Sequence, residues 1–206
     1  MSRRAPARVA PPRASSAHVA SPRRSHGHAV RIIGGQWKRS KLPVVDKPGL
    51  RPTPDRVRET LFNWLGQGLA GWRVLDAFAG SGALGFEAAS RGAAEVLLLE
   101  RDADLAQNLR ASAQRLKAAA LRVEAADALT WLARAPHDAS WDLVLLDPPF
   151  DAGLHAAAIA AALPLLAPGG FLYVESPGAL EPPAGLDRYR AARAGAVHFA
   201  LWRRPA

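Results

Sequence analysis

The chain has 206 residues, enough for one substantial α/β domain, and it contains no cysteine, which excludes disulfides and thiolate metal sites. No apolar stretch approaches the length that crosses a bilayer, so we expect a cytoplasmic protein without a membrane partner. With 27 lysines and arginines against 18 acidic residues, the net charge of +9 favours a polyanionic partner, nucleic acid first.

Residues 1–29 contain six arginines and no acidic residue, so they carry +6 of the net charge. They hold almost no large apolar side chain and cannot bury enough surface to offset the entropy of ordering. We predict a disordered tail, followed by a single domain over residues 30–206. The tail is expected to attract polyanions; the alternative is a solubilising tail without a partner.

Residues 30–50 are predicted to form a small N-terminal β-hairpin, with Gly34-Gly35 supplying the turn chemistry. Its loop is basic, and Trp37 lies there beside Lys38 and Arg39. An aromatic side chain among cationic ones suits single-stranded nucleic acid. A structural hairpin with solvated lysines is the alternative.

A leading helix is predicted within residues 51–70. Thr53 is a good N-cap, and Pro54 suits the first helical position. Helical spacing gives one buried stripe, formed by Val57, Leu61, Trp64 and Leu65. The charged residues between them, Arg58 included, are assigned to other, solvated faces. Arg51 lies in the preceding loop, where it could contact a ligand.

From residue 72 to the C-terminus, strands and helices alternate. Strands are predicted near 73–77, 95–100, 121–125, 142–147 and 170–175. Helices are predicted near 82–90, 103–117, 128–134 and 153–166. This alternation requires a mainly parallel sheet with right-handed crossovers. Segments 188–192 and 197–202 then form a hairpin, so the sheet ends in antiparallel strands.

The segment VLDAFAGSGALG, Val74 to Gly85, combines a strand, a glycine turn and the start of a helix. Its glycines satisfy G-x-G-x-x-G, and Glu100 ends the next apolar run, which is typical of a nucleotide cofactor site. Taken alone, this pattern fits a dinucleotide dehydrogenase as well as any other enzyme. Because backbone must approach the ligand closely, we expect Gly82→Val to lose cofactor binding without unfolding the protein.

The segment DLVLLDPPF, residues 142–150, is a buried strand that two prolines stop after Asp147. Its carboxylate therefore lies at the carboxyl end of a strand, where open α/β sheets bind ligands. Asp147 and the Pro148 carbonyl are two acceptors that could hold both N–H groups of a planar amino group. Phe150 could stack on the ring that carries this amino group. The alternative is a tight loop with Asp147 as a solvated turn residue.

Taken together, the segments RIIGGQWKRSKL, RPTPDRVRETLFNWL, LDAFAGSGALGFEAASRGA and LDPPF resemble the bacterial family of 16S rRNA guanine-N2 methyltransferases of the RsmD type. The resemblance runs from about Arg31 to the C-terminus and leaves the tail outside the family pattern. It implies a class I methyltransferase fold: a Rossmann-like, mainly parallel seven-stranded sheet over residues 72–206, with helices on both faces. It also implies methyl transfer from S-adenosylmethionine to one guanine in small-subunit rRNA, without a metal.

The resemblance assigns roles residue by residue. Cofactor contacts fall on Asp76, Phe78, Gly80, Ser81, Gly82, Glu100, Arg101, Asp127 and Ala128. In this assignment Glu100 takes the ribose hydroxyls and Asp127 meets the adenine amino group, although either could instead be a helix cap or a surface carboxylate. Asp147, Pro148 and Phe150 form the catalytic group. Substrate contacts fall on Arg31, Lys38, Arg39, Arg51, Thr53 and Arg56. Arg91 and Glu95 receive no role.

Three other functions stay open. An adenine-N6 methyltransferase of DNA or RNA uses a similar proline motif, although this chain leaves no room for a target-recognition domain. An NAD-dependent dehydrogenase accounts for the glycine turn but not for DPPF. A non-catalytic RNA-binding assembly factor could use the same fold. We expect a monomer whose rRNA substrate is presented within a small-subunit ribonucleoprotein particle.

Overall fold

The computed structural model describes residues 1, 29–45, 47, 53–136 and 140–206. The main sheet contains β3 (Arg73–Asp76), β4 (Glu95–Glu100), β5 (Leu121–Ala125), β6 (Trp141–Leu146), β7 (Leu166–Ser176), β8 (Asp187–Ala194) and β9 (Val197–Arg203). The helices are α1 (Asp55–Leu65), α2 (Ala83–Ser90), α3 (Ala103–Leu116), α4 (Ala128–Arg134) and α5 (His155–Ala162). Short 3₁₀ turns cover Phe150–Ala152 and Leu163–Leu165, and a separate hairpin pairs β1 (Ala29–Arg31) with β2 (Lys41–Pro43).

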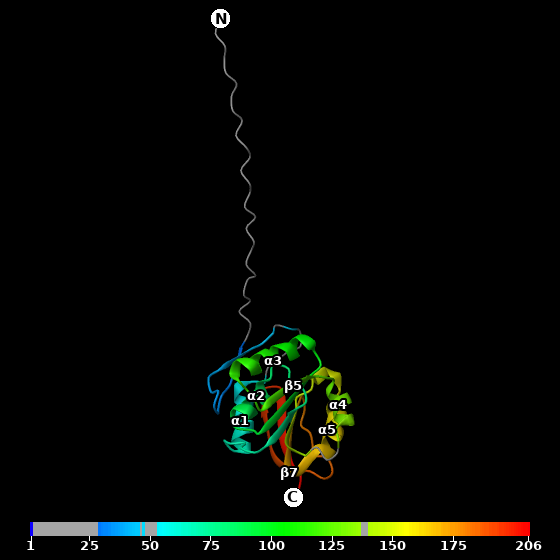
Figure 1. The fold of residues 1–206 in the computed structure, drawn as a ribbon. Coiled ribbons are helices and arrows are strands. Elements are labelled where there is room, and N and C mark those ends of the chain that lie inside the picture. The colour runs from blue at the N-terminus through cyan, green and yellow to red at the C-terminus, as the bar shows by residue number, and fades with distance from the viewer. Residues whose placement is uncertain (2–28, 46, 48–52, 137–139) are drawn as a thin grey trace.

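The seven strands follow the order β5-β4-β3-β6-β7-β9-β8. The first five are parallel, whereas β9 runs antiparallel to both β7 and β8. Helices α1, α2 and α3 cover one face of the sheet, and α4 and α5 cover the other (Figure 1). The predicted fold, a Rossmann-like parallel sheet finished by an antiparallel hairpin, is confirmed.

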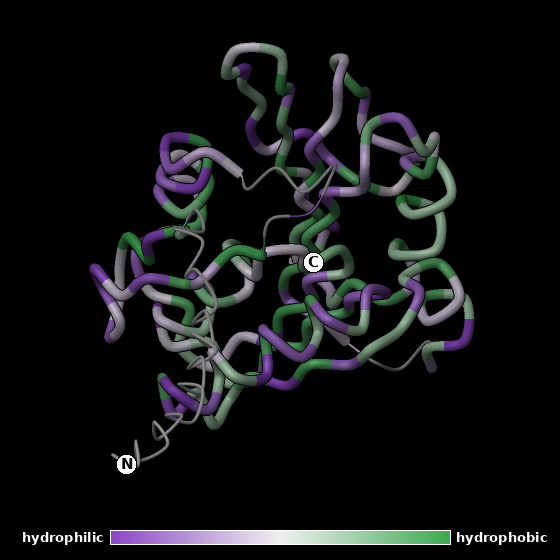
Figure 2. The backbone as a smooth tube through the Cα atoms, turned by 90° about the horizontal axis from the view of Figure 1, so that it is seen from above, coloured by the Kyte–Doolittle hydropathy of each residue, from purple (hydrophilic) through white to green (hydrophobic). Residues whose placement is uncertain are grey.

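The central strands are buried on both faces because their side chains alternate between two apolar cores. In β6, Leu143 and Leu145 pack toward α1–α3, whereas Val144 and Leu146 pack toward α4 and α5. Figure 2 shows the same distribution, with hydrophobic segments in green near the middle and most hydrophilic segments in purple at the periphery. Among the described residues, no helix has both the length and the apolar character of a membrane span.

The start of β7 differs from the prediction. The helix expected over 153–166 ends at Ala162, and β7 begins at Leu166 rather than near residue 170. Leu166 is buried and pairs with Trp141, and the register then shifts before Leu143. Gly170 makes this irregular pairing possible, since a Cβ there would lie 2.9 Å from the Trp141 carbonyl oxygen. The glycine therefore serves a β-bulge within the strand rather than the end of a helix.

Strand β8 forms one edge of the sheet, because among the described residues its only neighbouring strand is β9. Its exposed side chains include Arg188, Arg190 and Arg193. The register with β9 shifts between Arg188 and Arg190, so the strand is irregular in its first half. This edge is therefore both basic and uneven.

Glu87 on α2 fixes the N-terminal hairpin to the domain. Its carboxylate is fully buried, and its two oxygens accept the backbone N–H groups of Ile33 and Gly34, each at 2.8 Å. Arg91 pairs with it at 2.8 Å and Arg58 at 3.5 Å, which offsets the cost of burying the charge. Arg58 is itself fully buried, so its predicted place on a solvated face is wrong.

Gly34 and Gly35 are required where the hairpin loop lies against the end of α2. A Cβ on Gly34 would lie 2.4 Å from Nη2 of Arg91, and one on Gly35 would lie 1.8 Å from the Ser90 carbonyl oxygen. The Ser90 hydroxyl donates to the Gly34 carbonyl at 2.6 Å and accepts the Trp37 N–H at 3.0 Å. The hairpin loop therefore packs against the last turn of α2, and the two glycines allow that close approach.

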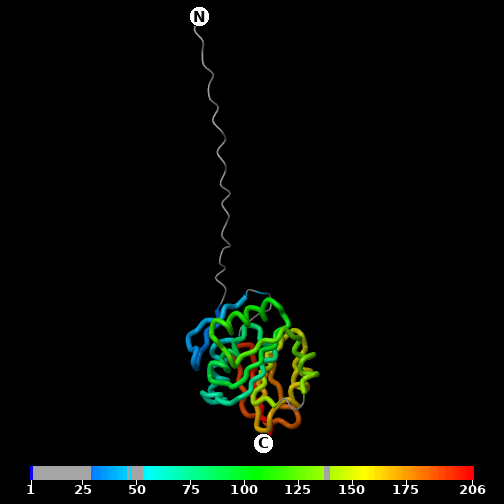
Figure 3. The backbone as a smooth tube through the Cα atoms, in the orientation of Figure 1, coloured from blue at the N-terminus to red at the C-terminus, as the bar shows by residue number. Residues whose placement is uncertain are grey.

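The other end of the hairpin contacts α3, although the two segments are far apart in the sequence. In Figure 3 the blue hairpin lies beside the green α3. Asn108 Nδ2 donates to the Pro43 carbonyl at 2.8 Å, and Arg115 donates to the Lys41 carbonyl at 2.7 Å. The hairpin is thus held by two helices of the same face.

We predict that Glu87→Ala lowers the free energy of unfolding by about 3–5 kcal/mol, because the substitution leaves two arginine charges and two backbone N–H groups without their buried partner. Urea denaturation of the purified variant measures this change. Glu59→Ala is the matched control, since Glu59 is exposed on α1, and its effect should stay within about 0.5 kcal/mol. Equal effects of the two substitutions would show that Glu87 does not hold the hairpin.

Candidate active site

Four carboxyl groups meet at the carboxyl edge of the sheet. Glu100, Asp76, Asp147 and Glu175 lie at the carboxyl ends of β4, β3, β6 and β7, which are consecutive neighbours in the sheet. By strand alternation all four point to the face covered by α1, α2 and α3. Within the described residues, no lysine or arginine nitrogen lies within 4.0 Å of any of these carboxylates. We call these residues the carboxyl row.

Asp147 is half-buried, and its Oδ2 accepts a hydrogen bond from the Thr53 hydroxyl at 3.2 Å. Burial raises the pKa of Asp147 to about 6, and the hydrogen bond from Thr53 opposes that rise. Asp147 is thus not a freely solvated turn residue. The predicted N-cap role of Thr53 is wrong: α1 begins at Asp55 after Pro54, without a side-chain cap, because the Thr53 hydroxyl bonds to Asp147 instead.

Asp76 lies under the glycine turn. Its Oδ2 accepts the Gly85 N–H at 3.0 Å, whereas its Oδ1 is buried without a hydrogen-bond partner. Burial, together with the negative charges of Asp147 and Glu100, raises the pKa of Asp76 to about 7. A buried acceptor without a partner is costly, so this atom fits a ligand that brings a cationic or N–H group.

Glu100 connects the glycine turn to the next loop. Its Oε2 accepts the Gly80 N–H and its Oε1 accepts the Asp102 N–H, both at 2.8 Å. Each carboxylate oxygen has further acceptor capacity, so ribose hydroxyls could still donate to it. Arg101, which follows, is exposed.

The glycine turn is shaped by packing as well as by any ligand. Gly82 has φ +77°, and a Cβ there would lie 2.6 Å from Leu109 Cδ2 and 2.7 Å from Phe86 Cδ2. At Gly85 a Cβ would lie 2.1 Å from Leu98 Cδ2. The effect of Gly82→Val on folding stays a prediction, and the substitution would strain the turn as well as fill cofactor space, because the new side chain meets Leu109 and Phe86. Nearby, Ser81 is buried and Phe78 packs against the core on the α4–α5 side.

Asp127 is the N-cap of α4, and its Oδ1 accepts both the backbone N–H and the hydroxyl of Thr130, at 2.9 and 2.8 Å. These two bonds, the backbone bond first, lower the pKa of Asp127. Ala128 beside it is buried. A hollow of about 400 Å³ runs along α4 from Ala126 and Asp127 to Pro136. Capping and a contact with adenine are both compatible with this placement.

Pro148 and Phe150 follow Asp147 on the same turn. Pro148 is buried, whereas Phe150 is 38% exposed, which is rare for a large apolar residue in the part of the chain that the structure describes. The ring centroid lies 6.0 Å from that of His155 at the start of α5. Phe150 therefore presents a partly exposed aromatic ring three residues after Asp147.

The predicted substrate residues fall into three groups. Lys38 and Arg39 are exposed in the hairpin loop, and Arg31 is exposed on β1. Arg56 is exposed on the first turn of α1. Thr53 is buried and bonded to Asp147, and Arg51 lies outside the described residues.

A family model described as Conserved hypothetical protein 95 matches residues 30–203. The chain belongs to this family. Ribosomal RNA small subunit methyltransferase D of Escherichia coli K12 is 44% identical over 188 residues, which cover 86% of this chain and 91% of that protein. The protein of the same name from Haemophilus influenzae is 44% identical over 151 residues, 71% of this chain and 78% of that protein. The solved structure of Escherichia coli yhhF has 44% identity and a TM-score of 0.77, over 87% of this chain and 99% of that one.

The family resemblance inferred from the sequence motifs is thereby confirmed. The roles assigned to single residues stay predictions, which the geometry of the site supports to different degrees. The glycine turn and DPPF meet at the carboxyl edge, although about 60 residues separate them, because β3 and β6 are parallel neighbours in the sheet.

Sequence reasoning missed two site residues, Tyr173 and Glu175. Both are buried on β7, and the Tyr173 hydroxyl donates to Glu175 Oε1 at 3.0 Å. The segment LYVE was a usable signal, because it ends an apolar strand in an acid as VLLD does in β6. Pro177 follows two residues after Glu175 and stops the strand, so the end of β7 was marked in the sequence as well.

We predict that Thr53→Val raises the pKa of Asp147 further above about 6, because the hydroxyl that stabilises the charged carboxylate is lost. Carbon-13 NMR titration of the aspartate carboxyl carbons in the free protein measures the midpoint. Thr60→Val is the control, since the Thr60 hydroxyl bonds the Arg56 carbonyl on α1 and not the carboxyl row. An unchanged or lower Asp147 midpoint in Thr53→Val would contradict the assigned hydrogen bond.

Proposed function

We propose that this protein transfers a methyl group from S-adenosylmethionine to the exocyclic N2 amine of a guanine in small-subunit rRNA. The names of the curated relatives give the reaction as methyl transfer and the RNA as that of the small subunit. The choice of an exocyclic amine rests on the Asp147-Pro148 turn. The position of the guanine, 966 in 16S rRNA, comes from the resemblance alone.

The carboxyl row is the observation that supports this function best. Burial of several acids without a cation raises the free energy of the free protein, and a cationic ligand relieves that cost. S-adenosylmethionine, when bound, supplies a methyl group on a positively charged sulfonium, an activated leaving group that needs no metal. Asp76 and Glu100 are placed to hold such a cofactor, with the partnerless Oδ1 of Asp76 as the clearest fit.

Asp147 and the Pro148 carbonyl would hold the two hydrogens of the substrate amine. The amine of guanine is a weak nucleophile because its lone pair is delocalised into the ring. Two fixed acceptors favour a pyramidal nitrogen and stabilise the positive charge that develops on it as it gains the methyl group. The amine then loses one proton, and Asp147 is the acceptor at hand. Phe150, exposed beside it, offers a stacking surface for a base removed from its helix.

The substrate would approach along the face that carries the N-terminal hairpin. Lys38, Arg39 and Arg31 are exposed there, and phosphate contacts from such residues position an RNA without reading its sequence. A domain of this size has few elements left to recognise a target, so we infer that a folded small-subunit ribonucleoprotein particle presents the guanine to a monomeric enzyme. This substrate also places the protein in the cytoplasm, where such particles are found.

We predict that Asp147→Ala lowers the rate of methyl transfer by at least about 100-fold while the affinity for S-adenosylmethionine stays within a few-fold. The reason is that Asp147 faces the amine, whereas the glycine turn, Asp76 and Glu100 face the cofactor. Single-turnover transfer from labelled cofactor to small-subunit particles gives the rate, and calorimetry gives the affinity. Asp151→Ala is the control, because Asp151 is an exposed aspartate four residues after Asp147.

Near wild-type transfer by Asp147→Ala would remove Asp147 from the mechanism. Digestion of the product RNA to nucleosides identifies the methylated base by mass spectrometry. N2-methylguanosine supports the proposed function, whereas N6-methyladenosine would favour the adenine enzyme. Calorimetric binding of NAD in place of S-adenosylmethionine would favour a dehydrogenase.

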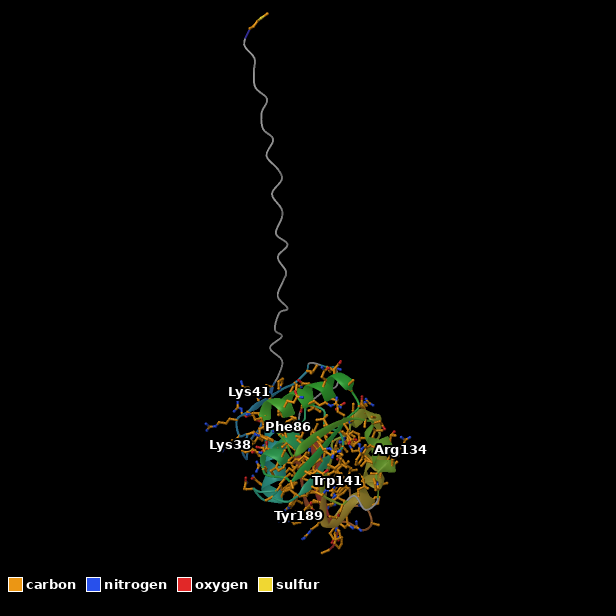
Figure 4. All side chains as sticks on the ribbon, in the orientation of Figure 1. Lys38, Lys41, Phe86, Arg134, Trp141 and Tyr189 are labelled. Carbon is orange, nitrogen blue, oxygen red and sulfur yellow. The ribbon has the colours of Figure 1, made fainter. Side chains whose placement is uncertain are left out.

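We predict that Lys38→Ala weakens rRNA binding and reduces the slope of log affinity against log salt by about 0.7, the value for one phosphate on single-stranded RNA. Filter binding across a salt series measures this slope. Arg134→Ala is the control: Figure 4 shows Lys38 and Lys41 on one side of the molecule and Arg134 on the other. Equal slopes for Lys38→Ala and the unsubstituted protein would show that the hairpin does not contact RNA.

A further inference from the structure

Glu175 lies directly beside Asp147. Strands β6 and β7 are parallel, with Leu145 opposite Tyr173 and Leu146 opposite Val174, so the next pair in this register is Asp147 and Glu175. Opposed residues of parallel strands point to the same face of a sheet. The Glu175 side chain is thereby brought to the substrate side of the site, although only 2% of the residue is exposed.

The surroundings of Glu175 favour its neutral form. On its own strand, the Tyr173 hydroxyl donates to Oε1 at 3.0 Å, which opposes the neutral form, whereas the negative charges of Asp147 at the end of β6 and Asp76 at the end of β3 favour it. His155 Nε2 on α5 lies 2.9 Å from the Glu175 backbone carbonyl oxygen, and the uncharged Thr53 hydroxyl, from the loop before α1, hydrogen-bonds to the carboxyl group and also favours its charged form. Within the described residues no cation pairs with it. Burial and the charge of Asp147 therefore raise the pKa of Glu175 to about 8.

The contrast with Glu87 shows what this environment means. Both side chains are buried carboxyl groups, but Glu87 is held by two arginines and two backbone N–H groups, whereas Glu175 has the uncharged hydroxyls of Tyr173 and Thr53. A structural carboxylate is charge-compensated in this way, because the cost of desolvating it must be offset. An uncompensated one next to another acid instead keeps its proton.

Building on the methyl-transfer function proposed above, we propose that Glu175 is a positioning residue for Asp147: as a neutral carboxylic acid packed beside it, Glu175 leaves the pair with a single negative charge, located at the amine-binding carboxylate. Ionised together, the two groups would repel each other and draw water between them. Asp147 would then lose the fixed position from which it holds the amine. The proton that the amine releases goes to Asp147 and from there to water, while Glu175 retains its own.

The pair predicts a bell-shaped pH dependence of the transfer rate. The rate rises as Asp147 loses its proton, near pH 6, and falls as Glu175 loses its proton, near pH 8. Glutamine has the shape of a protonated glutamate but cannot ionise. Glu175→Gln should therefore keep the transfer rate at pH 7 within about three-fold and lose the fall above pH 8.

The experiment compares single-turnover rates of the unsubstituted protein and Glu175→Gln from pH 5.5 to 9.5 on the same small-subunit particles, so that ionisation of the RNA is common to both. Glu181→Gln is the matched control, since Glu181 is an exposed glutamate, and it should keep the alkaline fall. Carbon-13 NMR titration of the glutamate carboxyl carbons in the free protein supplies a readout that does not depend on activity. One signal should titrate near pH 8 and be missing in Glu175→Gln.

Tyr173→Phe provides a second test that does not require Glu175 to be replaced. The tyrosine hydroxyl stabilises the charged form of Glu175, so its removal should move both the alkaline fall and the NMR midpoint to higher pH. This direction distinguishes a proton held at Glu175 from a purely structural effect, which would lower the rate equally at every pH.

The possible outcomes separate this inference from the proposed function. If the unsubstituted protein methylates no RNA, the proposed function fails, and the NMR titration still decides whether Glu175 is neutral at pH 7. If it methylates RNA but Glu175→Gln keeps the same alkaline fall, the positioning role is overturned. A Glu175 signal that titrates near its ordinary value of 4.5 would overturn it as well.

Discussion

Burial of acidic side chains at the carboxyl edge of the parallel sheet is the constraint on which this site depends. Strands β4, β3, β6 and β7 are apolar along most of their length, since helices cover both faces of the sheet there. Each of the four has a carboxyl group at its carboxyl end. Four neighbouring strands repeat this pattern, so acids that would repel one another are held together by the sheet itself. The folded protein bears this cost without a bound ligand, and binding of a cation recovers part of it.

In the described part of the chain, buried charges are paired with opposite charges around Glu87 but not along the carboxyl row. Around Glu87 every charge has a partner, and the result is a rigid attachment of the hairpin to α2. Along the carboxyl row the charges lack cationic partners among the described residues, and the pKa values of Asp76, Asp147 and Glu175 all rise. Because α2 begins at the glycine turn and ends at the hairpin loop, one short helix connects the two regions. Its complete burial leaves it little freedom to move independently of either.

Much of the fold and part of the site could be predicted from the sequence. Proline marks the end of β6 after Asp147, and glycine marks the turn before α2, so both features are local and visible in the chain. The burial of Arg58 is not local: helical spacing separates faces but does not reveal that Glu87, 29 residues later, supplies a buried partner. The N-cap prediction for Thr53 was wrong for the same reason, because the Thr53 hydroxyl donates to Asp147, a residue distant in the sequence, and not to the helix N-terminus. Glu175 was missed although the predicted strand 170–175 ends on it and Pro177 follows, because its place beside Asp147 depends on the pairing of β6 with β7.

Strand β8 has a consequence for how the protein behaves at high concentration. An open sheet edge exposes unpaired backbone groups to which the edge of another molecule can add. Here the exposed Arg190 and Arg193 of β8 place like charges near each other in any such pair, and the shifted register near Tyr189 makes the edge irregular. Charge repulsion of this kind reaches only about 8 Å at physiological ionic strength and less in stronger salt. The same arginines that keep copies of the sheet apart in dilute buffer therefore lose that effect as salt rises, and the uneven register remains as the barrier to edge-to-edge aggregation.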